Sequence, residues 1–137
     1  MRILALFFIA ALAIAQAPSS FQPVGNMSQL MIDMIYPTSD AIFYVERAVP
    51  QNDREWSAVR ASALTLAESG NLLMMDKRAR DQGDWIKDSK MLVDAGAAAY
   101  KAAQAKDLAA IVAVNEQLYT ACVTCHQAYR PGYRRRQ

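Results

Sequence analysis

The chain has 137 residues, of which 53% are hydrophobic and 20% are charged. Its 15 basic and 13 acidic side chains give a formal net charge of +2, a near-balance that argues against a nucleic-acid binder. Two cysteines three positions apart are too few for a disulfide framework. The size predicts one small domain with a single core.

The N-terminus has the features of a secretory signal peptide. A positive start at Arg2 is followed by an apolar run over residues 3–15 and by a small-x-small pattern at residues 15–17. The apolar run would make about 20 Å of helix, short of the roughly 30 Å hydrocarbon core of a membrane. We therefore expect residues 1–17 to be removed, and residues 18–137 to form a single domain outside the cytoplasm with no membrane span.

The remaining sequence has helical patterns throughout. Proline is absent from residues 51–130, and the alternation typical of strands is missing. The first helical segment begins near Asn26 and contains Pro37, which predicts a bent or two-piece helix. Its predicted inward face consists of Met27, Leu30, Met31, Met34 and Ile35.

A second segment starts with Asn52 or Asp53 as N-cap and Glu55 in capping-box spacing, and is expected to end near Asp76. Gly70 in its interior costs about 1 kcal/mol relative to alanine.

Two further segments complete the pattern. The third has Asp84 as its predicted cap, and the fourth begins at Asp107 and ends at Pro131-Gly132. Residues expected to face inward on the third are Trp85, Ser89, Leu92, Gly96, Ala99 and Tyr100. Four amphipathic segments with short connections predict an all-α, antiparallel four-helix bundle.

The chemistry is concentrated in the sequence Cys122-Val123-Thr124-Cys125-His126. C-x-x-C-H is the spacing of covalent c-type haem attachment, because two thiols one helical turn apart reach two vinyl groups while the histidine presents an imidazole to iron. A thioredoxin-like pair would need a βαβ context, and a structural zinc site would need four ligands although His126 is the only histidine. A plain disulfide or two inert core thiols are the remaining alternatives.

The C-terminal pattern Cys122-x-x-Cys125-His126-x-x-Tyr129-Arg130, in a four-helix chain of this length, resembles the class II cytochromes c, the family of cytochrome c prime. The resemblance implies one haem c bound through thioethers at Cys122 and Cys125, iron ligation by His126, and a basic residue, Arg130, beside the haem. Independently, Arg130 lies one turn after His126 and can approach a haem propionate. Tyr129 is expected to pack along the haem edge or to fill core.

The sixth position on the iron separates two functions. A single histidine excludes bis-histidine ligation within a monomer. The sequence Gln29-Leu30-Met31 resembles the region that supplies a methionine ligand in some members of the family, which points to Met31. Met27, Met34 and an open distal face are the alternatives, and a methionine stripe at helical spacing also fits an ordinary core.

Methionine ligation would suit one-electron transfer, whereas an open apolar distal pocket would bind a small gas such as NO or CO. We expect a periplasmic mono-haem electron carrier and not an enzyme, because no distal histidine is present. The expected partners are a periplasmic redox donor and acceptor, which Arg130 and Arg134–Arg136 could steer if they are acidic. Homodimers are common in the resembled family, which allows a homodimer here.

Overall fold

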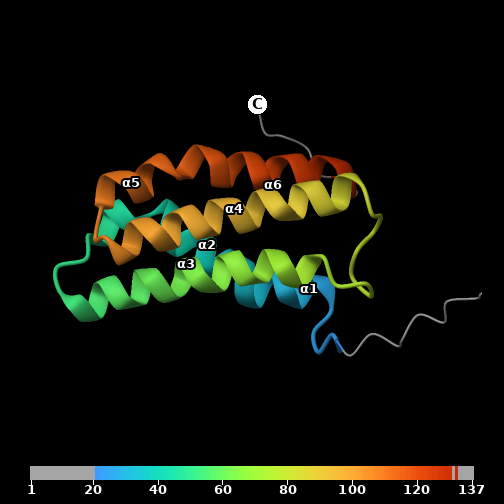
Figure 1. Cartoon of the computed structure of the whole chain (residues 1–137), viewed down its shortest axis with the longest axis horizontal. Helices are drawn as coiled ribbons and strands as arrows, with labels where there is room; N and C mark the ends of the chain where they lie inside the picture. Colours follow the sequence, from blue (N-terminus) through green and yellow to red (C-terminus); the bar gives the residue numbers. More distant parts are fainter. Residues whose placement is uncertain (1–20, 131, 133–137) are drawn as a thin grey trace, which may run out of the picture.

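The computed structural model describes residues 21–130 and 132. All regular structure in this part of the chain is helical, and it forms four rods that pack side by side around one core (Figure 1). The predicted helical bundle is therefore confirmed. The rods are α1 (Met27–Gln29), η1 (Leu30–Ile35) and α2 (Tyr36–Phe43) in succession; α3 (Asp53–Leu73); α4 (Asp84–Gln104); and α5 (Leu108–Ala113) with α6 (Asn115–Tyr129).

A short 3-10 helix, η2 (Val45–Ala48), follows the first rod. The signal-peptide prediction for residues 1–17 and the predicted role of Arg134–Arg136 concern parts of the chain outside the described residues.

Three predicted helix starts are confirmed. The side chains of Asn26, Asn52 and Asp107 each accept a hydrogen bond from the backbone N–H three residues further on. These bonds satisfy donors that the start of a helix leaves without a partner. The end of the second predicted segment is wrong by three residues, because α3 ends at Leu73 and not at Asp76.

Two details of the predicted caps are also wrong. The Glu55 carboxylate accepts from the backbone N–H of Gln51 at 2.6 Å and from the side-chain amide of Asn52 at 2.9 Å, and not from the Asn52 backbone N–H as a capping box requires. Asp84 is the first residue of α4 and caps nothing. Asp81 takes that role, since its carboxylate accepts from the backbone N–H of Trp85 at 3.1 Å.

The first rod continues past Pro37 and does not separate into two helices. Of the two predicted outcomes, a bent helix and a two-piece helix, the two-piece helix is therefore not formed. Upstream of the proline the backbone widens into the π-helical turn η1, in which the Tyr36 N–H donates to the Met31 carbonyl. Proline lacks an N–H, and its ring clashes with the carbonyl four residues earlier in a regular α-helix. The wider turn accommodates the ring, and the Thr38 hydroxyl donates to the Met34 carbonyl at 2.6 Å.

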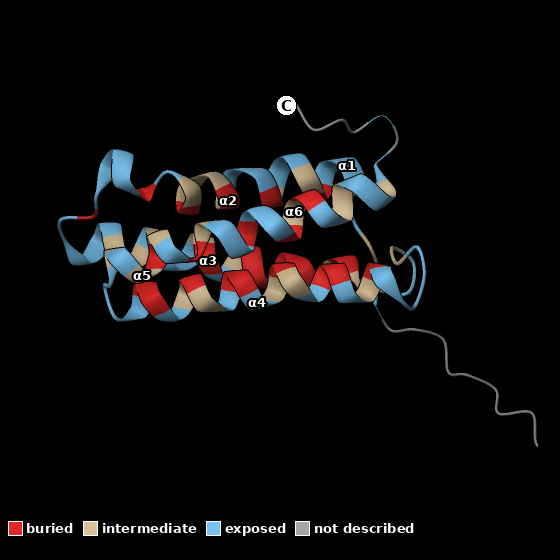
Figure 2. Ribbon diagram, turned by 90° about the horizontal axis from the view of Figure 1, so that it is seen from above, coloured by how far each residue is buried: buried red, intermediate tan, exposed pale blue. Residues whose placement is uncertain are grey.

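The core lies along the facing sides of the rods (Figure 2). Fully buried side chains come from every rod: Ile42, Leu66, Ala95, Ala99, Ile111 and Leu118. Of the predicted inward residues, Leu30, Ile35, Trp85, Ser89, Leu92, Gly96 and Ala99 are buried, whereas Met27, Met31, Met34 and Tyr100 are half-buried.

Glycines let α3 and α4 approach each other closely. A Cβ on Gly96 would lie 2.5 Å from the backbone nitrogen of Ala67, and one on Gly70 would lie 2.6 Å from Cγ2 of Val93. The helix-weakening Gly70 is therefore explained by packing, because a larger residue would push the two helices apart.

The segment Leu108–Tyr129 is long and apolar enough to cross a membrane by length and composition alone, a test that core helices of soluble proteins also pass. In this structure it packs against α4.

Candidate functional site

A cleft of about 540 Å³ lies between the first rod and α6. This volume is in the range of sites that hold cofactors and other small molecules. All the residues that the sequence singled out near the C-terminus line this one cleft: Cys122, Cys125, His126, Tyr129 and Arg130. The structure thus brings the whole predicted C-terminal set together.

The helix α6 itself places the three residues of the motif. Positions i, i+3 and i+4 lie on the same face of an α-helix, so Cys122, Cys125 and His126 all face the cleft. Both cysteines are half-buried free thiols. The disulfide alternative is therefore not formed in this structure.

The environment of the thiols disfavours a redox pair of the thioredoxin kind. Burial raises the pKa of Cys122. Burial, with smaller electrostatic contributions from Asp88 and Cys122, raises the pKa of Cys125 to about 11. Catalytic dithiols need a lowered pKa to supply a thiolate at neutral pH, and both sulfurs here are held as thiols.

His126 is held in the form that a metal can use. It is half-buried, and burial lowers its pKa, with a further lowering from the positive charge of Arg130. Its imidazole is therefore neutral at neutral pH, as metal ligation requires. Within residues 21–130 and 132, no cluster of three or more His, Cys, Asp and Glu could hold a metal ion by itself.

The opposite wall of the cleft comes from the first rod and separates the three candidate methionines. Met27 and Met31 line the cleft, but Met34 does not. Met31 also lines a smaller inner cavity of about 40 Å³, which it shares with Cys122, Cys125 and His126. Of the three, Met31 is therefore best placed to face the motif.

Two residues that line the cleft, Arg80 and Trp85, and one that contacts its Tyr129, Asp81, were not singled out from the sequence as site residues. Arg80 lies in the connection before α4. The charged sequence of this connection indicates a solvated loop, yet Arg80 lines the cleft together with Arg130. Trp85 packs edge-on against Tyr129, with ring centroids 4.9 Å apart. Asp81 accepts a hydrogen bond from the Tyr129 hydroxyl at 2.5 Å. No local pattern could have found Arg80 or Asp81, because their positions depend on how the loop meets α6.

Two polar residues of α4 line the inner cavity. Asp88 is 5% exposed and Ser89 is 1% exposed. Burial raises the pKa of Asp88, and the nearby charge of Asp84 raises it further. The sequence predicted only that Ser89 faces inward.

No protein-family model, curated protein or solved structure matches this chain.

Proposed function

We propose that the chain is a periplasmic mono-haem c-type cytochrome that transfers single electrons. In this proposal it is an antiparallel four-helix bundle with one haem c attached to α6, at Cys122 and Cys125. One observation carries the proposal: two free thiols, a neutral imidazole and the Met31 side chain all line a single cleft of cofactor size.

The residues of the cleft suit a flat apolar ring that bears two carboxylates. Its walls are mostly apolar, with Ile32 and Ile35 beside Met31. Arg80 and Arg130 come from two different parts of the chain and both line the cleft. Guanidinium groups bind carboxylates through paired, charge-assisted hydrogen bonds, so each arginine can hold one propionate.

The two thiols would anchor the group covalently. Each sulfur would add to one vinyl group, with the new bond from sulfur to one vinyl carbon and the thiol proton going to the other as the double bond becomes single. Their burial keeps Cys122 and Cys125 protonated at neutral pH. No redox change is needed in this addition, so no further reactant is required.

When bound, haem supplies an iron that gains and loses one electron. His126 would ligate it from α6 as a neutral imidazole, and Met31 would ligate it from η1 on the other wall. Methionine and histidine ligation raises the reduction potential. Partner redox proteins would dock at the cleft mouth near Arg130.

A second candidate function is binding of a small gas. The apolar lining around Met31, with Ile32 and Ile35, would leave room for NO or CO on the iron if Met31 does not ligate it.

The test is to express the full chain in a bacterial host that matures c-type cytochromes. The expected product is a periplasmic protein that keeps its haem in denaturing electrophoresis. Cys125→Ser is expected to leave at most one thioether bond, while the matched control Thr124→Ala, at an exposed position between the two cysteines, keeps both. A wild-type chain without covalent haem would refute the proposal.

The reduced absorption spectrum with and without CO then separates the two functions. A sharp low-spin spectrum unchanged by CO indicates a methionine-ligated electron carrier. A high-spin spectrum that shifts with CO indicates the gas-binding protein.

A further inference from the structure

The inner cavity contains a polar pair that the proposed ligands leave without a role. Asp88 and Ser89, adjacent on α4, are 5% and 1% exposed, and both line the cavity of about 40 Å³ that Met31 and Cys125 also line. Buried polar groups are costly unless they are hydrogen-bonded. A pair at this place therefore needs an explanation.

Ser89 differs from the other buried serines. The hydroxyl of Ser69 donates to the carbonyl of Thr65 at 2.7 Å, and that of Ser39 donates to the carbonyl of Tyr36 at 3.0 Å. Such bonds to the preceding turn are the ordinary way for a helical serine to satisfy its hydroxyl. Ser89 Oγ has no hydrogen-bond partner in the described part of the chain.

Asp88 lies close enough to the attachment motif to affect it. Its negative charge is the second largest cause of the raised pKa of Cys125, after burial. Asp88 and Cys125 line the same inner cavity.

We propose that Asp88 and Ser89 form a buried polar site beside the Cys125 attachment point, bridged by one water molecule, and that this site lowers the reduction potential of the haem. The inference depends on the proposed function. A cavity of about 40 Å³ is large enough for one water. That water would accept from the Ser89 hydroxyl and donate to the Asp88 carboxylate.

The sign follows from electrostatics. Ferric haem carries one more positive charge than ferrous haem, so a buried carboxylate nearby stabilises the ferric state. Burial and hydrogen bonding around a haem are established means by which proteins set its potential. Asp88 and Ser89 are thus positioning residues that act on the haem without ligating the iron.

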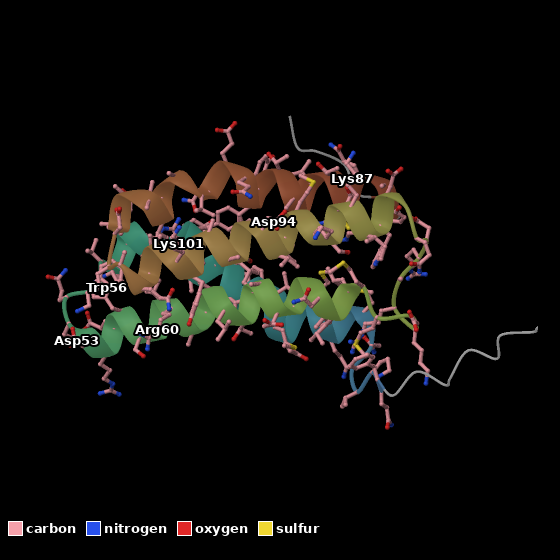
Figure 3. All side chains as sticks on the ribbon, viewed as in Figure 1. Asp53, Trp56, Arg60, Lys87, Asp94 and Lys101 are labelled. Atoms are coloured by element: carbon pink, nitrogen blue, oxygen red, sulfur yellow. The ribbon has the colours of Figure 1, made fainter. Side chains whose placement is uncertain are left out.

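The experiment compares the midpoint potentials of the haem-loaded wild type, Asp88→Asn and Ser89→Ala. The matched control is Asp94→Asn, on the same helix but at an exposed position (Figure 3). We expect a higher potential in Asp88→Asn, a smaller rise in Ser89→Ala, and no change in Asp94→Asn. Because the two residues share one water, the double variant should shift no further than Asp88→Asn.

A second readout uses haem-free protein with Cys122→Ser, so that Cys125 is the only thiol. The rate of alkylation of Cys125 by iodoacetate, divided by its rate with iodoacetamide, reports the local electrostatic potential, since only iodoacetate is negatively charged. Asp88→Asn is expected to raise this ratio, and Asp94→Asn is not.

The two proposals fail in different ways. A wild-type chain without covalent haem overturns the proposed function and this inference with it. If the wild-type chain carries haem but Asp88→Asn changes neither the reduction potential nor the alkylation ratio, the inference about Asp88 and Ser89 is overturned and the proposed function is not. If Asp88→Asn does not mature, a wild-type potential in Ser89→Ala overturns the paired site.

Discussion

The hydroxyl of Tyr129 donates a hydrogen bond of 2.5 Å to the carboxylate of Asp81 and so joins the last turn of α6 to the loop before α4. The same carboxylate accepts from the backbone N–H of Trp85, whose ring packs edge-on against Tyr129. The carboxylate of Asp81 therefore links the start of α4 to the last turn of α6.

This contact predicts a loss of stability at high pH. The hydrogen bond to Asp81 raises the pKa of Tyr129 from 10.0 to about 12. A group whose pKa is raised by folding contributes stability that is complete below its unfolded pKa and is lost as the pH rises through the folded value. Wild type should therefore lose stability between pH 10 and about 12, and Tyr129→Phe should lose less.

Urea unfolding across that pH interval measures the effect. Tyr119→Phe is the control, because Tyr119 is exposed. Equal pH dependence in wild type and Tyr129→Phe would show that the contact does not persist in solution.

Asp81 predicts the opposite behaviour in acid. Its pKa is lowered from 3.8 by the hydrogen bonds from Tyr129 and Trp85. A lowered carboxyl pKa contributes stability that is present above pH 3.8 and is lost as the pH falls below it. Asp81→Asn should be less stable than wild type at neutral pH, and the difference should shrink as the pH falls below 3.8. A difference that stays constant in acid would contradict this linkage.

Met31→Ala tests the ligand from the first rod. If Met31 ligates the iron, its loss opens a coordination position, and the reduced protein should bind CO readily. Met34→Ala is the matched control, since Met34 lies one turn away and does not line the cleft. An unchanged spectrum in Met31→Ala, with and without CO, would remove Met31 from the site.

Gly96→Ala tests the close approach of α3 and α4. The added Cβ would lie 2.5 Å from the backbone nitrogen of Ala67, and backbone cannot move aside as a side chain does. We expect the free energy of unfolding to fall by about 1–3 kcal/mol, as for other overpacked cores. In Gly25→Ala the nearest atom is Cβ of Gln29 at 3.5 Å, so this control should change little. Similar unfolding midpoints for the two variants would contradict the packing.

Lys106→Gly tests the turn after α4. Lys106 has a φ of 54°, and its N–H donates to the Ala103 carbonyl while that of Asp107 donates to the Ala102 carbonyl. Glycine is preferred in this left-handed position because other residues are strained there by about 1 kcal/mol. The ion pair between Lys106 and Asp53 is exposed at both side chains and contributes little. Thermal unfolding should show Lys106→Gly to be more stable, and Lys106→Ala, which keeps the strain, should not be.

The sequence by itself determined the helical class, three of the helix starts and the shared face of Cys122, Cys125 and His126. These features depend on interactions within about one helical turn, namely caps and i, i+3, i+4 spacing. Such interactions involve only residues that are close in the sequence, so the sequence is sufficient to predict them.

Only the tertiary structure decided which distant residues meet the motif. Arg80 and Asp81 come close to residues of α6 because of the path of a loop, and Asp88 lines the same inner cavity as Cys125 because α4 packs beside α6. The π-helical turn before Pro37 was likewise not predicted, because a proline within a helix is compatible with a kink, a break or a wider turn. Packing among the rods selects one of these, and no single segment contains that information.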